Sequence, residues 1–173
     1  MGSDLPECSL APMSTGDLDN VLEIESVSFS NPWRRRDFDY ALAQANGFCR
    51  ISRIDGIVIG YAVGFFAGTE LHLADLAVRP DCHRRGYGRA ILELLLVELE
   101  ARGTGLVTLE VRRSNVRAVK LYSGAGFSTV AIRGAYYSRP IEDAVVMLKA
   151  LAGVLSDWIP SSLSQIIENG ESS

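Results

Sequence analysis

The stretch VRPDCHRRGYGRAILELLL, Val78 to Leu96, decides the fold of this chain. It begins as the end of a β-rich run, passes through a basic turn with two glycines, and continues as an apolar segment with helical spacing. Glycines at 86 and 88 let the backbone approach a ligand, and the helix that begins there directs unpaired N–H groups toward it. This pattern predicts an anion site, to which three arginines add positive charge: Arg84, Arg85 and Arg89.

The kind of phosphate can be narrowed by what the turn lacks. A dinucleotide-binding fingerprint requires a third glycine where this chain has Ile91, and a Walker loop requires a Gly-Lys-Ser/Thr sequence that is absent here. A mononucleotide or the pyrophosphate of coenzyme A remains. The alternative is a plain strand-to-helix turn with solvated arginines.

The remaining segments alternate between helical and strand patterns. Two amphipathic helices are expected early in the chain, one capped by Ser14 and Thr15 and one containing Phe38. Asp55-Gly56 is typical of a tight hairpin turn. The later elements are expected at Glu70 to Val78, Gly88 to Ala101, Leu106 to Val111, Asn115 to Tyr122, Phe127 to Ile132 and Asp143 to Leu148. This order favours an α+β, three-layer fold over a doubly wound one.

Composition indicates one soluble domain. The chain has 173 residues and a net charge of -4, which argues against a nucleic-acid binder and favours a positively charged partner. Three cysteines without a paired motif and two histidines predict reduced thiols, a cytoplasmic location and no metal. Residues 1–150 are expected to form the domain, and residues 151–173 a C-terminal helix and flexible tail. A partner-docking or membrane-surface helix is the alternative for that end.

Four motifs carry a family resemblance. LAVRPDCHRRGYGRAIL resembles the acetyl-coenzyme-A loop of the GCN5-related N-acetyltransferase (GNAT) superfamily. LEVRRSNVRAVKLYSGAGF, with SFSNPW before it and AYYSRPIEDAVVM after it, is similar to the RimI-type ribosomal-protein-alanine N-acetyltransferases. The resemblance covers about Ser9 to Leu148 and implies a GNAT fold: a mixed, mostly antiparallel sheet of about six to seven strands flanked by about four helices. His83, Gly134-Ala135 and the tail after Ala150 depart from the usual pattern.

The resemblance implies acetyl-coenzyme A as co-substrate and no metal. The pyrophosphate is expected on the backbone of the basic turn, and the pantetheine arm along the strand before it. Asn115 is expected to cap the next helix and to hydrogen-bond the coenzyme. The implied coenzyme-binding residues are Leu76, Ala77, Val78, Arg84, Arg85, Gly86, Tyr87, Gly88, Arg89 and Asn115.

Two residues are expected to carry the chemistry. Alternation along the strand at 106–111 puts Glu110 on the face opposite its apolar neighbours. The resemblance makes Glu110 the general base and Tyr122 the general acid beside the sulfur. The structural alternatives are an exposed strand face, or a partner of Arg112 or Arg113, for the glutamate, and a core aromatic for the tyrosine.

The acceptor is expected to be the α-amine of a protein N-terminus. Such an amine has a pKa of about 7.7 to 8.0 against about 10.4 for lysine, so its deprotonation at neutral pH costs about 3 kcal/mol less. The resemblance implies the N-terminal alanine of a small-subunit ribosomal protein, a basic partner. The peptide would lie between Phe29, Pro32, Trp33, Tyr136 and Tyr137. No nucleic acid or membrane partner is expected, and the chain is expected to be a monomer or weak dimer. Lysine side chains, a small-molecule amine, or a non-catalytic coenzyme-A-binding module are the alternatives.

Overall fold

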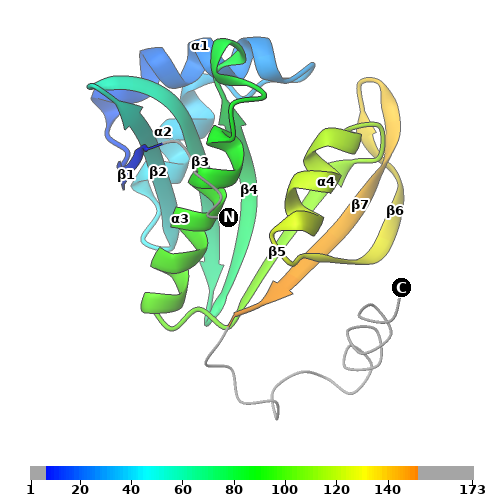
Figure 1. Cartoon of the computed structure of the whole chain (residues 1–173). Helices are drawn as coiled ribbons and strands as arrows, with labels where there is room; N and C mark the ends of the chain where they lie inside the picture. The colour runs from blue at the N-terminus through cyan, green and yellow to red at the C-terminus, as the bar shows by residue number, and fades with distance from the viewer. Residues whose placement is uncertain (1–6, 152–173) are drawn as a thin grey trace.

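One mixed seven-stranded sheet organises the computed structural model, which describes residues 7–151 (Figure 1). The strand order is β1-β2-β3-β4-β5-β7-β6, and every neighbouring pair is antiparallel except β4 and β5. The strands are β1 (Ser9–Pro12), β2 (Gly47–Ile54), β3 (Ile57–Ala67), β4 (Glu70–Val78), β5 (Leu106–Arg112), β6 (Ser128–Ser138) and β7 (Ile141–Ala150). The helices are α1 (Leu18–Ser28), α2 (Arg35–Ala43), α3 (Tyr87–Ala101) and α4 (Val116–Gly124), with short 3₁₀ turns η1 (Thr15–Asp17) and η2 (Pro80–Cys82). The predicted α+β class and mostly antiparallel sheet are confirmed.

Helices cover both faces of the sheet. Leu92, Leu95 and Leu99 of α3 pack with β5 side chains and Tyr122 of α4 in one buried cluster. Leu18 and Val21 of α1 pack with Phe38 of α2 and with β3 in a second cluster on the other face. The amphipathic patterns predicted these buried faces, since apolar residues three and four positions apart share one side of a helix. Within residues 7–151, none of the helices is both long and apolar enough to cross a membrane.

The parallel pair β4 and β5 separates along its length. Their residues pair only from Glu70 with Leu106 to Leu73 with Leu109. Beyond that point the two strands diverge, and α3 lies over one arm and α4 over the other (Figure 1). The diverging ends leave backbone groups of β4 without a strand neighbour on that side, which a ligand can then use.

A β-bulge at Ala74 accompanies the separation. In the pairing of β3 with β4, Val63 lies opposite Asp75 while Gly64 lies opposite Leu73, so Ala74 has no partner. One extra residue reverses which face the following side chains occupy. Leu73 therefore packs on the α3 side, whereas Ala77 packs on the α1 side. Asp75 is carried to the α1 side by the same reversal.

The last two strands are longer than the sequence predicted. The sequence predicted strands over Phe127 to Ile132 and Asp143 to Leu148. In the structure β6 continues to Ser138 and β7 begins at Ile141, with an irregular register between Arg133 and Tyr137. The irregular pairing accommodates Gly134, so the β6–β7 hairpin continues past Ala144, where the pairing of β7 with β5 ends. Of the predicted C-terminal segment, Leu151 is buried in the α3-side core, and residues 152–173 lie outside the described residues.

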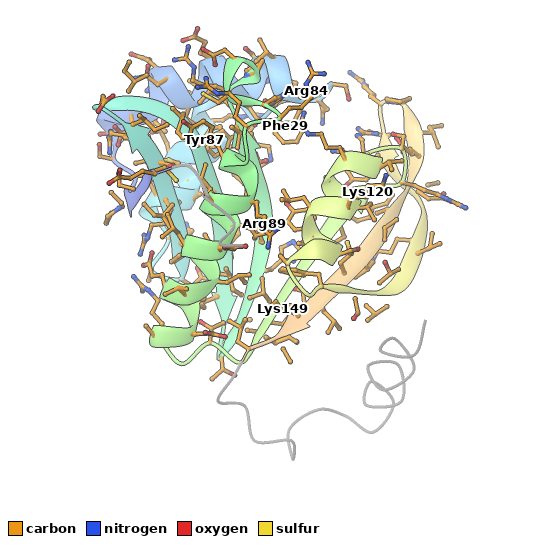
Figure 2. The ribbon with its side chains drawn as sticks, in the orientation of Figure 1. Phe29, Arg84, Tyr87, Arg89, Lys120 and Lys149 are labelled. Atoms are coloured by element: carbon orange, nitrogen blue, oxygen red, sulfur yellow. The ribbon has the colours of Figure 1, made fainter. Side chains whose placement is uncertain are left out.

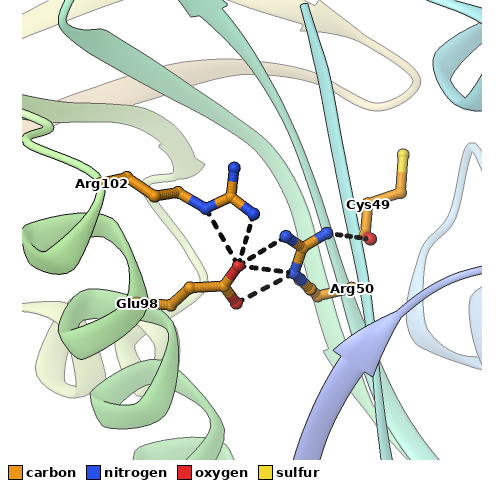
Figure 3. A network of polar contacts seen from close by, with 4 residues as sticks. All are labelled: Cys49, Arg50, Glu98 and Arg102. Carbon is orange, nitrogen blue, oxygen red and sulfur yellow. Dashed lines mark hydrogen bonds and ion pairs between the residues drawn. The ribbon is translucent and has the colours of Figure 1, made fainter.

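A partly buried ion-pair network ties α3 to β2. The carboxylate of Glu98 accepts from Arg50 Nε at 2.9 and 3.0 Å and from Arg102 Nε at 3.0 Å (Figure 3). Arg50 also donates to the carbonyl oxygen of Cys49 at 2.9 Å and is itself buried. These two cationic partners lower the pKa of Glu98, chiefly through the hydrogen bond from Arg50.

Replacing the acceptor of this network is expected to destabilise the protein. In Glu98→Gln the buried Arg50 guanidinium loses its charged partner, so the free energy of unfolding at pH 7 should fall by about 2 kcal/mol. Because the folded-state pKa of Glu98 lies below its unfolded value, the stabilisation is present above pH 4 to 5 and is lost as pH falls further. Urea denaturation at pH 7 and pH 3.5 should show a gap between wild type and variant that narrows at the lower pH; an equal gap at both would contradict this.

Candidate active site

The basic turn before α3 opens onto a cavity of about 520 Å³ between α3 and α4. Figure 2 labels Arg84 and Arg89 on the α3 side of this opening and Lys120 on α4. These three side chains line the cavity together with Arg117. Four cationic groups around one opening indicate a site for a multiply charged anion.

The backbone of the turn fits a pyrophosphate. Gly86, the N-cap of α3, has φ +83°, and no side chain caps the helix N-terminus. The first N–H groups of a 15-residue helix therefore remain available to an anion. A Cβ on Gly88 would lie 3.7 Å from Leu121 and 3.9 Å from Val78, both of which line the cavity, and would narrow it. An anion site at this turn stays a prediction that the geometry of the helix N-terminus supports.

The edge of β4 facing this cavity presents backbone donors that no neighbouring strand uses. Arg79 N–H donates to Ile59 of β3, and alternation along an antiparallel strand directs the Ala77 N–H to the same partner strand. The N–H groups of Leu76 and Val78 consequently point toward the side where β5 has diverged. Both residues line the cavity. An extended pantetheine arm can pair there as an added strand would.

A second cavity of about 270 Å³ continues from the first between the diverging strands. The two cavities share four lining residues: Phe29, Leu76, Asn115 and Ala118. Asn115 also accepts a hydrogen bond from Ala118 N–H at 3.1 Å, which confirms it as the N-cap of α4. A molecule whose phosphates lie at the turn could thus place its far end in the second cavity.

Glu110 and Tyr122 both line this second cavity. They reach it from opposite faces of the sheet: Tyr122 belongs to the core under α3 and α4, whereas Glu110 alternates with the core residues Leu109 and Val111. Burial raises the pKa of Tyr122 above its usual value. The phenol therefore keeps its proton at neutral pH until an anion forms beside it.

Glu110 is held by partners that its sequence neighbours did not suggest. Its Oε1 lies 3.0 Å from Arg133 Nη1 on β6, and its Oε2 lies 3.2 Å from His72 Nε2 on β4. Arg112 and Arg113, the alternative partners expected from sequence, pair instead with Glu142 and Asp143 at 3.4 and 3.5 Å. Glu110 is thus neither exposed nor paired with either neighbouring arginine.

Two segments that are distant in sequence form one wall of the second cavity. Phe29 and Trp33 line it from the α1–α2 connection, and Tyr137 from β6. Ser30 Oγ donates to the Arg139 carbonyl oxygen at 3.2 Å, which joins the connection to the β6–β7 hairpin. Burial raises the pKa of Tyr137 to about 12, although the adjacent Arg112 guanidinium opposes this shift. Tyr137 remains a neutral hydroxyl available to peptide groups.

Some predicted residues lie beside the cavities and do not line them. Pro32 and Tyr136 are outside the wall of the second cavity, and Arg85 and Tyr87 are outside the wall of the first. Tyr136 instead contacts Tyr137 edge to face, with ring centroids 5.1 Å apart. The guanidinium carbon of Arg85 lies over the Tyr87 ring, 5.7 Å from the ring centroid.

Comparison with known proteins assigns the family. The acetyltransferase (GNAT) family matches residues 18–127 of this chain, which contain β4, the basic turn, β5 and α4. The chain belongs to the GNAT acetyltransferase family. This GNAT chain is 35% identical over 142 residues to the ribosomal protein bS18-alanine N-acetyltransferase of Escherichia coli K12, covering 80% of this chain and 95% of that one.

Solved structures of GNAT proteins have the same fold. The crystal structure of the ribosomal-protein-S18-alanine N-acetyltransferase from Escherichia coli superposes with a TM-score of 0.80 at 31% identity, covering 89% of this chain and all of that one. Arabidopsis thaliana Naa50 in complex with the bisubstrate analogue CoA-Ac-MVNAL superposes with a TM-score of 0.71 at 20% identity, covering 82% and 97%. The predicted membership and the acetyltransferase class are confirmed.

Sequence reasoning missed a buried acidic group in this GNAT site. Glu25 of α1, 1% exposed, accepts from the Trp33 N–H at 2.6 Å and from the Tyr61 hydroxyl. The same hydroxyl lies 3.3 Å from Asp75, and both carboxyl groups line the second cavity. Burial, and then the neighbouring Glu25 charge, raises the pKa of Asp75 well above its usual value. Asp75 is therefore the member of the pair that holds a proton.

A neutral substitute for Asp75 should be tolerated. An acid whose folded-state pKa is raised loses stability as pH rises, because the unfolded chain releases its proton above about pH 4 while the folded chain keeps it. Asp75→Asn removes this penalty. Its free energy of unfolding should equal or exceed that of wild type at pH 7, and the difference should shrink toward pH 4.

The control for this variant is Asp81→Asn. Asp81 is an exposed carboxylate that pairs only at the surface with Arg79, so its removal should change the free energy of unfolding little. Denaturant titrations of the three proteins across pH 4 to 7 make the comparison. A loss of stability in Asp75→Asn that grows as pH rises would show that Asp75 is charged in the folded protein.

Proposed function

We propose that this protein transfers the acetyl group of acetyl-coenzyme A to the N-terminal α-amine of a protein, most specifically the N-terminal alanine of a small-subunit ribosomal protein. One observation carries the proposal. A cavity lined by a carboxylate and a phenol, Glu110 and Tyr122, continues directly into a basic cavity at a helix N-terminus. The activity named for the Escherichia coli relative supports the same acceptor class.

The coenzyme half of the site binds and aligns acetyl-coenzyme A. Amides at the start of α3 hold the pyrophosphate, and Arg84, Arg89, Arg117 and Lys120 surround it. The N–H groups of Leu76 and Val78, on the side of β4 from which β5 has diverged, hold the pantetheine arm and polarise the thioester carbonyl. Their donors face the position where negative charge develops on oxygen, which is the requirement for stabilising the tetrahedral species.

The acceptor half supplies and removes protons. Glu110 accepts a proton from the incoming amine, whose nitrogen then attacks the acetyl carbon. Tyr122 donates its proton to the departing sulfur, which otherwise leaves as a thiolate. Entry of the amine from the side of Phe29, Trp33 and Tyr137 places it next to Glu110, while the sulfur arrives from the side of α4.

The proposed acceptor is an α-amine because the base is a single carboxylate. At neutral pH a substantial fraction of α-amino groups is already neutral, whereas a lysine must be deprotonated at a cost of about 3 kcal/mol more. One wall of the second cavity combines the α1–α2 connection with Tyr137 of β6, and the Ser30 contact joins that connection to the β6–β7 hairpin, which suits a peptide chain that enters by its end.

A thiol-release assay with three acceptors tests the function. The protein and acetyl-coenzyme A are incubated with an Ala-Arg-starting peptide, with the same peptide blocked at its N-terminus but carrying a lysine, and with a polyamine. Mass spectrometry should locate the acetyl group on the alanine nitrogen of the first peptide. Product on the lysine or polyamine alone would favour those acceptors, and coenzyme binding without any product would favour a binding module.

Removing the base should slow turnover without weakening coenzyme binding. In Glu110→Gln the amide cannot accept the amine proton, so kcat should fall about 100-fold or more while KM for acetyl-coenzyme A stays close to wild type. The matched control is Asp39→Asn, which replaces an exposed carboxylate of α2 with an amide. If Glu110→Gln retained the turnover of this control, Glu110 would not be the base.

A further inference from the structure

Glu110 has a titratable side chain behind it, on the side away from the cavity. We propose that His72 receives the proton that Glu110 takes from the acceptor amine and releases it to solvent. This inference rests on the proposed function, since it completes the path of that proton. It assigns to His72 a positioning and proton-relay role in which the imidazole contacts the base and does not contact the substrate.

The geometry places the two groups in sequence from cavity to solvent. Glu110 lines the cavity and its side chain is 11% exposed. His72 Nε2 lies 3.2 Å from Glu110 Oε2, and the His72 side chain is 41% exposed and lies outside the cavity wall. A proton that enters on Glu110 can therefore leave through the imidazole without returning past the acceptor.

The other partner of Glu110 cannot do this. Arg133 Nη1 lies 3.0 Å from Oε1, but a guanidinium keeps its proton at any pH at which the protein is folded. Arg133 therefore stabilises the carboxylate charge of Glu110 and relays no proton. A histidine can gain and lose a proton near neutral pH, and its two nitrogens can serve different partners.

The second ring nitrogen is also held. His72 Nδ1 lies 3.3 Å from Thr108 Oγ1, and Thr108 donates its hydroxyl hydrogen to Glu70 Oε1 at 3.1 Å. Because that hydrogen points to Glu70, Oγ1 is left to accept from Nδ1–H. Nε2 is then the nitrogen free to accept a proton from Glu110. On β3 the residue opposite His72 is the uncharged Phe65, so the charged groups facing the imidazole from its own and both neighbouring strands are Glu110 and Glu70.

The overall reaction requires such an exit. An acceptor ammonium carries three hydrogens: one stays on the amide nitrogen, one restores Tyr122 after its proton has gone to the coenzyme thiol, and the third must leave. In the proposed step the N–H bond of the ammonium breaks as an O–H bond forms on Glu110. That O–H bond then breaks as Nε2–H forms, and the imidazolium loses a proton to water. The carboxylate is restored and no electron is transferred.

Two variants separate a relay from a passive partner. His72→Ala leaves a space in which imidazole from the buffer can bind, and His72→Gln places a polar side chain at this position that cannot titrate. With acetyl-coenzyme A and the Ala-starting peptide, both variants should lose on the order of tenfold in kcat with unchanged KM for the coenzyme. Added imidazole should restore turnover of His72→Ala saturably and leave wild type unaffected.

The outcomes distinguish a failure of the His72 relay from a failure of the proposed acetyltransferase function. Wild-type turnover in His72→Gln, or a slow His72→Ala on which imidazole has no effect, would overturn the relay while leaving the acetyltransfer intact. No acetylated peptide from wild type would contradict the proposed function itself. Unfolding midpoints of both variants identify any loss of folding, and the glutamine variant decides the question if the alanine variant does not fold.

Discussion

The separation of β4 from β5 is the constraint on which the rest of this structure depends. Two parallel strands that pair through Leu73 and Leu109 and then diverge create a gap in the middle of the sheet. Backbone donors of β4 along this gap have no strand partner, so a ligand in the gap can bind them. In the proposed function a coenzyme arm pairs with them and is positioned by the gap. The catalytic geometry thus follows from an interruption in the sheet.

Charge divides the gap into two halves. The coenzyme half is bordered by four cationic side chains and a helix N-terminus, and the acceptor half contains the carboxyl groups of Glu25, Asp75 and Glu110. An anionic coenzyme and a cationic amine are therefore drawn to different ends of one continuous space. The bulge at Ala74 contributes to both halves. It accompanies the divergence of the strands, and it turns Asp75 toward Glu25 and Tyr61.

The features that the sequence predicted lie within single segments, whereas the contacts that it missed depend on how the strands pair in the sheet. The phosphate turn, the Asn115 cap and the alternation that isolates Glu110 each lie within a few consecutive residues, so spacing alone identified them. Placing Tyr122 near Glu110 needed the family resemblance. The contacts of Glu110 with His72 and Arg133 join three strands whose pairing no single segment encodes. Glu25 was hidden for a different reason: an acidic residue on an amphipathic helix is ordinarily solvated, and only the folded chain buries it against Tyr61.

A crystal structure with a bisubstrate analogue, coenzyme A joined through its acetyl group to the nitrogen of an alanine-starting peptide, tests the central claim most directly. The account predicts the pyrophosphate on the amides at the start of α3, the pantetheine arm paired with Leu76 and Val78, and the joined nitrogen between Glu110 and Tyr122. An analogue bound with its phosphates away from that turn, or with its nitrogen out of reach of Glu110, would contradict it.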